Sequence, residues 1–211
     1  MEEKELRDEL ATIRNLMERS SKFISLSGLS GILAGLYALI GAAAAYYILY
    51  TDIHTHSYVL PYHIVEDIQA IVYIYGLLLI AAVVLVASVL TAIILSARQA
   101  KRKSQPIWGK ISQAMLFHMA TPLVAGGVFI LIFLIRGYYG IIAPSSLIFY
   151  GISLVSASSF TFTDVKYLGL CEIALGLIAA CLPGYGLLFW ALGFGVLHII
   201  YGSMVYLKYD R

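Results

Sequence analysis

Charged side chains are scarce in this sequence. Only 12% of its 211 residues are Asp, Glu, Lys or Arg, whereas 61% are hydrophobic, and the mean hydropathy is +0.87. So few polar residues cannot cover a hydrophobic core in water, which excludes a soluble globular domain. The net charge is only +2, and no basic stripe with interleaved aromatic residues occurs on a soluble segment. The composition therefore also excludes a nucleic-acid partner.

Cysteines and catalytic motifs are nearly absent as well. Cys171 and Cys181 lie in one predicted helix, about 15 Å apart by the helical rise, so they cannot bridge each other. We interpret them as small apolar residues or free thiols. The sequence has no glycine-rich phosphate loop before a helix, no Gly-x-Ser-x-Gly elbow and no His-Glu-x-x-His pair. These absences leave no candidate catalytic residue, and no motif predicts a cofactor.

Six long apolar runs are what the sequence does contain. They predict an all-α polytopic membrane protein, because a helix needs about 20 apolar residues to cross the hydrocarbon core of a bilayer. The fifth run is the shortest and is bounded by Thr163-Asp164 and Pro183-Gly184. The predicted transmembrane helices of this six-helix bundle are 24–50, 68–96, 111–135, 141–160, 167–182 and 187–207. Together they make one transmembrane domain over residues 23–211.

The basic residues predict an orientation for this bundle. All but one of the fourteen Lys and Arg residues fall on the same side of the six spans, and Arg136 is the exception. They are Lys4, Arg7, Arg14, Arg19, Lys22, Arg98, Lys101, Arg102, Lys103, Lys110, Lys166, Lys208 and Arg211. Because basic residues near span ends stay on the cytoplasmic side, we expect both termini in the cytoplasm.

Residues 1–22 have the pattern of an amphipathic cytoplasmic helix. Leu6, Leu10, Ile13 and Met17 recur at spacings of four, three and four. Basic and acidic residues nearly cancel in this segment, which disfavours binding to an anionic lipid surface. A short coiled coil, packing against the 97–110 connection and a plain solvated helix all fit the pattern. A homo-oligomer or another membrane protein is therefore a candidate partner, in addition to the lipid bilayer.

Small residues form a stripe along the first span. They recur every three or four residues, which places them on one helical face, and small residues let membrane helices approach closely. The stripe consists of Gly28, Gly31, Gly35, Ala38, Ala42 and Ala45. We interpret it as packing within the bundle, since six spans must bury several such faces. The segment 28–38 has a counterpart in 169–179 with the same glycine, leucine, isoleucine and alanine spacing, which we attribute to shared packing needs.

Three ionisable residues lie inside the later spans, each on a stripe of small residues. His118, Glu172 and His198 therefore point toward neighbouring helices and not toward lipid, and all three are predicted in the cytoplasmic half of the bilayer. If they meet, they are a candidate proton-linked transport site, a polar cavity, or a ligand set for a metal or haem. A hydrogen-bonded pair that fixes helix packing is the alternative interpretation. One sequence does not decide between them.

The loop after the first span is a candidate metal site. Asp52, His54, His56 and His63 lie within a short stretch that also contains Glu66 and Asp67. Imidazole and carboxylate groups are ligands for Zn²⁺, Cu²⁺ or Ni²⁺. The spacing matches no closed zinc motif, and such residues are also ordinary in a solvated loop. Both interpretations stay open.

The second half of the chain resembles a family of small six-span bacterial membrane proteins without assigned activity. The resemblance covers the third to sixth spans, in the segments Leu147-Ile-Phe-Tyr-Gly, Tyr167-Leu-Gly-Leu-Cys-Glu-Ile, Pro183-Gly-Tyr-Gly-Leu-Leu-Phe-Trp and His198-Ile-Ile-Tyr-Gly. It implies a location in the bacterial inner membrane. It implies nothing about chemistry.

Three hypotheses about function follow. The missing catalytic motifs, the N-terminal helix and the basic inner connection favour a non-enzymatic sensor, accessory or assembly module. Glu172 with His118 and His198 favours a small-solute or proton-linked transporter or channel. A metal- or haem-bearing intramembrane enzyme would require His118 and His198 within about 4–5 Å of a shared centre.

Overall fold

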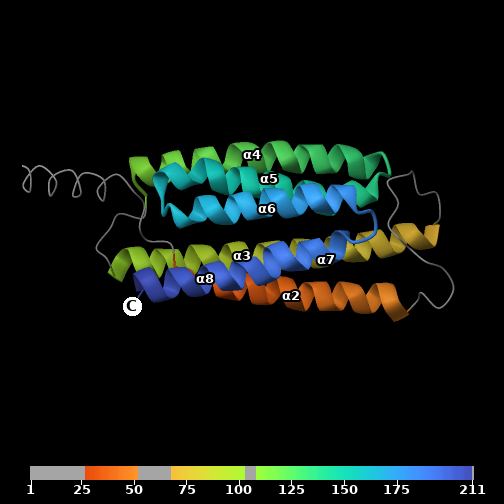
Figure 1. Cartoon of the computed structure of the whole chain (residues 1–211), viewed down its shortest axis with the longest axis horizontal. Coiled ribbons are helices and arrows are strands. Elements are labelled where there is room, and N and C mark those ends of the chain that lie inside the picture. The colour runs from red at the N-terminus through yellow and green to blue at the C-terminus, as the bar shows by residue number, and fades with distance from the viewer. Residues whose placement is uncertain (1–26, 52–67, 103–107, 211) are drawn as a thin grey trace, which may run out of the picture.

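The computed structural model describes residues 27–51, 68–102 and 108–210 (Figure 1). Within these ranges all regular structure is helical, as the apolar runs predict. The long helices are α2 (Gly28–Thr51), α3 (Ile68–Arg102), α4 (Lys110–Ile135), α5 (Ile142–Ala157) and α6 (Asp164–Cys181). Short 3-10 turns flank α5, namely η1 (Tyr139–Ile141) and η2 (Ser158–Phe160). The predicted helix over residues 1–22 and the 52–67 loop lie outside the described residues.

The last pass along the bundle is a composite helix, which we call the C-terminal helix. It consists of α7 (Gly186–Trp190), η3 (Ala191–Leu197), α8 (His198–Val205) and η4 (Tyr206–Asp210). The segments η3 and η4 are π-helical. A π-helical turn inserts an extra residue between hydrogen-bonded groups and is often found at functional sites. The sequence pattern gave no indication of either π-helical turn.

Within the described residues, five helical segments are long and apolar enough to cross a membrane. They are 28–49, 72–102, 110–135, 139–160 and 186–209. Helix α6 is not among them, because its 18 residues include three charged residues, Asp164, Lys166 and Glu172. The described part of the chain therefore contains five candidate spans, with α6 running antiparallel beside α5 (Figure 1).

Tight turns join the later helices into an up-and-down arrangement. Gly137 and Gly184 have φ angles of 79° and 93°, a region that glycine adopts without a steric penalty. At the end of α4 the backbone N–H of Tyr138 donates to the Phe133 carbonyl over 2.9 Å, which closes the helix in a left-handed turn. Connections this short force consecutive helices to run antiparallel.

The helices form two groups of three. In the upper half of Figure 1, α5 packs against both α4 and α6, and in the lower half α2 packs against both α3 and the C-terminal helix. The hydroxyl of Ser153 on α5 donates to the Met119 carbonyl on α4 over 2.8 Å. In the other group, the Tyr37 and Thr91 hydroxyls lie 3.4 Å apart between α2 and α3. The seam between these two groups is the place where elements distant in sequence meet.

Each group contains one pair of helices in backbone contact at glycines. A Cβ atom added at Gly35 would lie 2.6 Å from the carbonyl oxygen of Gly195. One added at Gly169 would lie 2.6 Å from the carbonyl oxygen of Gly151. The stripe predicted on the first span therefore lies against the C-terminal helix within the same chain. Its members Ala38, Ala42 and Ala45 are also buried. The counterpart segment on α6 packs in the same way against α5, so the repeated spacing serves the same kind of close helix contact.

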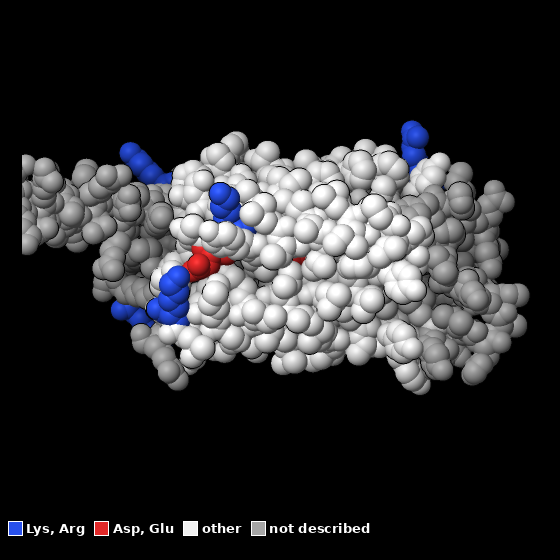
Figure 2. Space-filling model, in the orientation of Figure 1, with Lys and Arg blue, Asp and Glu red and all other residues white. Residues whose placement is uncertain are grey.

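Charges are segregated along the bundle. Among the described residues, six Lys and Arg lie at the end where α3 and the C-terminal helix terminate and where α4 and α6 begin, which we call the basic end. They are Arg98, Lys101, Arg102, Lys110, Lys166 and Lys208. Arg136 lies at the opposite end, after α4. Figure 2 shows a wide belt between the two ends that is white on the face in view except for a small red spot near its middle.

Candidate functional site

Glu172 occupies the middle of α6 and faces the seam between the two helix groups. Its side chain is 0% exposed. Neither of its carboxyl oxygens has a hydrogen-bond partner among the described residues. Buried polar groups are almost always hydrogen-bonded, and an unpaired one costs about 1–3 kcal/mol, or more if it is charged. This carboxyl group is therefore the most unusual polar group in the described part of the chain.

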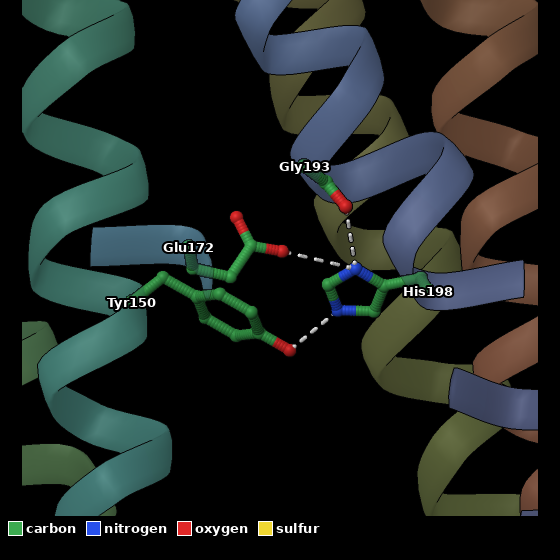
Figure 3. A network of polar contacts seen from close by, with 4 residues as sticks. All are labelled: Tyr150, Glu172, Gly193 and His198. Atoms are coloured by element: carbon green, nitrogen blue, oxygen red, sulfur yellow. Dashed lines mark hydrogen bonds and ion pairs between the residues drawn. The ribbon is translucent and has the colours of Figure 1, made fainter. Parts of the chain in front are cut away.

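His198 approaches Glu172 from the other helix group. Its Nδ1 lies 3.4 Å from Glu172 Oε1 and 3.0 Å from the backbone carbonyl oxygen of Gly193 (Figure 3). Its other ring nitrogen, Nε2, lies 2.8 Å from the Tyr150 hydroxyl oxygen. Tyr150 comes from α5, so the three side chains belong to three different passes of the chain.

The hydrogen-bond partners assign the tautomer of His198. A carbonyl oxygen only accepts, so Nδ1 must carry the hydrogen that it donates to Gly193. In the neutral ring Nε2 then has a lone pair and accepts the hydrogen of the Tyr150 hydroxyl. Glu172 Oε1 is a second acceptor near the same Nδ1–H, at a longer distance than the Gly193 oxygen. The carboxylate therefore competes for a hydrogen that is already in use.

Gly193 makes the close approach of Glu172 feasible. A Cβ atom at this position would overlap Glu172 Oε2 and would lie 2.5 Å from Leu147 Cδ2. Leu147 is itself fully buried. The carboxyl group is thus enclosed by the Gly193 backbone on one side and a leucine side chain on the other.

Aromatic rings line the His198 side of the site. The Tyr150 ring lies 5.1 Å from Phe194 and 5.4 Å from His198, and Trp190 lies 5.3 Å from Phe194, between ring centroids. Such surroundings have a low dielectric constant and solvate ions poorly. A net charge in the site is therefore costly, whereas an arrangement in which Glu172 and His198 together are neutral is not.

The site can hold one exchangeable proton in a neutral arrangement. The proton resides either on Glu172 beside a neutral His198, or on His198 as an ion pair with the Glu172 carboxylate. Losing that proton leaves a carboxylate facing apolar groups, and gaining a second leaves an imidazolium. Both changes introduce net charge at the seam between the helix groups, which favours entry of water there.

His118 is not part of this arrangement. It is an exposed residue of α4, with its ring stacked on Phe160 at a centroid distance of 4.8 Å and edge-on to Phe117. Among the described residues it has no hydrogen bond to Glu172 or His198. Helix α4 packs on α5 and not on the C-terminal helix, so its position in the bundle separates the two histidines. Of the three ionisable residues singled out in the sequence, the fold brings together two.

Sequence reasoning missed Tyr150 and Gly193. A tyrosine in the middle of an apolar span is itself a signal, because transmembrane tyrosines are enriched at the membrane surfaces. Gly193 gave no comparable signal, since it lies in a segment with several packing glycines. Its role depends on the π-helical turn η3, which carries its carbonyl oxygen to His198 Nδ1.

The other predicted sites have separate outcomes. Asp52, His54, His56 and His63 lie outside the described residues. Within the described ranges, no cluster of three or more His, Cys, Asp or Glu residues is arranged to hold a metal ion. Cys171 and Cys181 are free and exposed on α6.

Comparisons of the chain with family models, curated proteins and solved structures found no match.

Proposed function

We propose that this protein is an integral protein of the bacterial cytoplasmic membrane that crosses the bilayer six times, with both termini in the cytoplasm. Five helices have the length and composition of spans. Helix α6 is the sixth span in this proposal. Asp164 and Lys166 lie in its first turns near the membrane surface, and Glu172 faces the bundle interior. The segregation of basic residues supports the orientation.

We further propose that Glu172 binds and releases a proton, and that the protein is a non-enzymatic membrane sensor that responds to this event. The observation that carries the proposal is a fully buried carboxyl group without a hydrogen-bond partner, located between two helix groups. Ionisable residues inside membrane bundles mark proton or ion sites by default.

The proton couples to conformation through the charge of the seam. With one proton on either Glu172 or His198 the site is neutral, and the two helix groups stay in contact. After release the carboxylate requires water or new donors, which it reaches most readily if the groups separate. A partner that recognises one of the two arrangements would then report proton concentration. The proposal needs no bound cofactor.

A proton-linked transporter is a second candidate. The site lies near the middle of α6 and of the 139–160 and 186–209 spans, at the seam between two three-helix groups. Transporters commonly place coupling sites near the bilayer midplane between moving units. In a transporter, binding and release of the same proton would switch a small-solute site between the two sides of the membrane.

Infrared difference spectroscopy of the protein in lipid nanodiscs tests the proposal. We expect a carboxylic-acid C=O band that disappears between acidic and alkaline buffer in the wild type. The band should be absent from Glu172→Gln and present in Asp164→Asn, which changes the other described acidic residue of α6. If Glu172→Gln gives the same difference spectrum as the wild type, Glu172 is not the proton site.

Proteoliposome assays distinguish the two candidates. Proton flux that depends on an added solute, and that is lost in folded Glu172→Gln, supports the transporter. A titrating band with no flux for any solute tested supports the sensor.

A further inference from the structure

A second polar contact joins the two helix groups at the basic end. Asp164 is the first residue of α6, and its Oδ2 accepts a hydrogen bond from Lys208 Nζ at 3.0 Å and one from the Tyr209 hydroxyl at 3.1 Å. Both donors belong to η4, the last segment of the C-terminal helix. The Tyr209 ring also stacks on Phe162, with 4.1 Å between centroids. The Oδ2 atom of Asp164 thus links the two helix groups at their basic ends.

An apolar layer separates this contact from Glu172. It consists of Leu154, Phe162, Val165, Leu168 and Val205, all buried. Tyr150 and Tyr201 pack against the same layer, together with Leu197 and Tyr209. The layer draws residues from both helix groups, so it stays dry only as long as the groups remain in contact. Water that enters from the basic end has to pass it to reach Glu172.

The two polar contacts follow one seam. Asp164 and Glu172 are separated by about 12 Å along α6, which is roughly two helical turns. Their partners Lys208 and His198 occur in the reverse order on the antiparallel C-terminal helix. Each contact also coincides with a π-helical segment, η3 directly before His198 and η4 around Lys208 and Tyr209. Such segments are less regular than an α-helix and mark positions where a helix readjusts.

The end contact has the properties of a releasable one. The Lys208 side chain is 54% exposed and Asp164 is 18% exposed, so water and salt reach the pair. Exposed ion pairs are weak and are screened by salt. The groups that face the Asp164 carboxylate are Lys208 and Tyr209 from the C-terminal helix, with Tyr201 one layer deeper.

We infer that Asp164, Lys208 and Tyr209 form a latch that closes the seam at the basic end and controls how readily water and protons reach Glu172. The inference rests on the proposed function of Glu172. While the latch is closed, η4 stays on α6 and the apolar layer remains intact. When the latch opens, the ends of the two groups separate and the route to Glu172 becomes wet.

The exchange rate of the Glu172 proton tests the latch. The wild-type protein and the double variant Lys208→Ala/Tyr209→Phe are transferred into D2O in nanodiscs, and the shift of the carboxyl band is followed in time. We expect exchange to be about fivefold faster or more in the double variant, within the usual range of coupling between linked sites. Lys166→Ala is the matched control. It removes an exposed basic residue from the first turn of α6, next to Asp164, and this residue has no part in the latch.

A second variant distinguishes opening of the latch from misfolding of the double variant. Asp164→Asn removes the charge and keeps an acceptor oxygen, so it should show a smaller acceleration than the double variant. Exchange equal to that of the wild type in both variants overturns the latch and leaves the proton site intact. If the wild type has no titrating band that Glu172→Gln removes, the proposed function itself fails.

Discussion

The centre and the basic end of the seam contain similar groups in different surroundings. At each place a carboxyl group on α6 meets a nitrogen base on the C-terminal helix, and a tyrosine hydroxyl completes the contact. At the end, Asp164 accepts two hydrogen bonds and remains partly exposed. At the centre, Glu172 accepts none and is fully buried. Similar residue types therefore give a satisfied, screened contact in one place and an unsatisfied carboxyl group in the other.

The difference indicates that the two contacts have different roles. A hydrogen-bonded ion pair near water tolerates the charge of Asp164 and contributes little to stability. A carboxyl group among apolar residues does not tolerate charge, so its state depends on the proton it binds. Five substitutions in four experiments test this comparison, taken from the largest expected effect to the smallest.

Gly193→Ala should have the largest effect. The new Cβ would overlap Glu172 Oε2 and press on Leu147, and overpacking of this kind costs about 3 kcal/mol at the upper end of the usual range. The free energy of unfolding in detergent measures the loss. Gly127→Ala is the matched control, because nothing lies within 4 Å of a Cβ at that helical position. Equal stability of the two variants would mean that the centre is not tightly enclosed.

Glu172→Gln should change how stability depends on pH. A buried carboxylate without hydrogen-bond donors destabilises the folded protein, whereas the protonated acid carries no charge to solvate. The wild type should therefore become less stable in alkaline buffer, by more than the ~1–3 kcal/mol that an unpaired neutral polar group costs. The amide variant has no proton to lose and should not. Thermal unfolding across a pH series is the measurement, and parallel curves for the two proteins would count against the account.

Tyr150→Phe and Tyr209→Phe compare the two tyrosines directly. Removing the Tyr150 hydroxyl leaves His198 Nε2 unpaired in the apolar centre, with an expected loss of about 1 kcal/mol. Tyr209 donates to a carboxylate that keeps its bond to Lys208 and is partly exposed, so its variant should lose less. Chemical unfolding of both variants under one condition gives the ranking. The opposite order would place the more important contact at the end.

Lys208→Ala should have the smallest effect on stability, and the effect should vanish in high salt. The ammonium group is exposed, so dissolved ions already screen its attraction to Asp164. Unfolding at low and high ionic strength measures this dependence. A large loss of stability that persists in high salt would show that Lys208 contributes more to the end contact than a screened ion pair does.

Much of the fold follows from the apolar pattern. Most helices begin and end within a few residues of the predicted ranges, but α3 continues six residues past its predicted end, to Arg102, because its basic last turns still form helix. The range predicted as 167–182 begins three residues earlier, at Asp164, since a polar first turn still forms helix. The stripe on α2 correctly marks a buried face, because small residues in this pattern permit close helix contact.

The site was predictable in part. The stripes around Glu172 and His198 point both residues inward, and both are buried. The same reasoning gave His118 an inward direction, yet it is exposed, because a small-residue stripe does not state which neighbour covers it. Which helices are neighbours, and therefore which ionisable residues meet, depends on the arrangement of the two groups. The π-helical turns changed the local register in a way that no periodicity in the sequence indicated.

Distance measurement between the two groups as a function of pH tests the central claim most directly. Spin labels on the native Cys181 of α6 and on Ile40→Cys of α2, with Cys171 replaced by Ser, report the separation in nanodiscs; Cys181 and Ile40 are both exposed. The account predicts a short distance in acidic buffer, a longer or broader distribution in alkaline buffer, and no change with pH in Glu172→Gln. A wild-type distance that is the same at every pH, or a pH-dependent change that survives in Glu172→Gln, would contradict it.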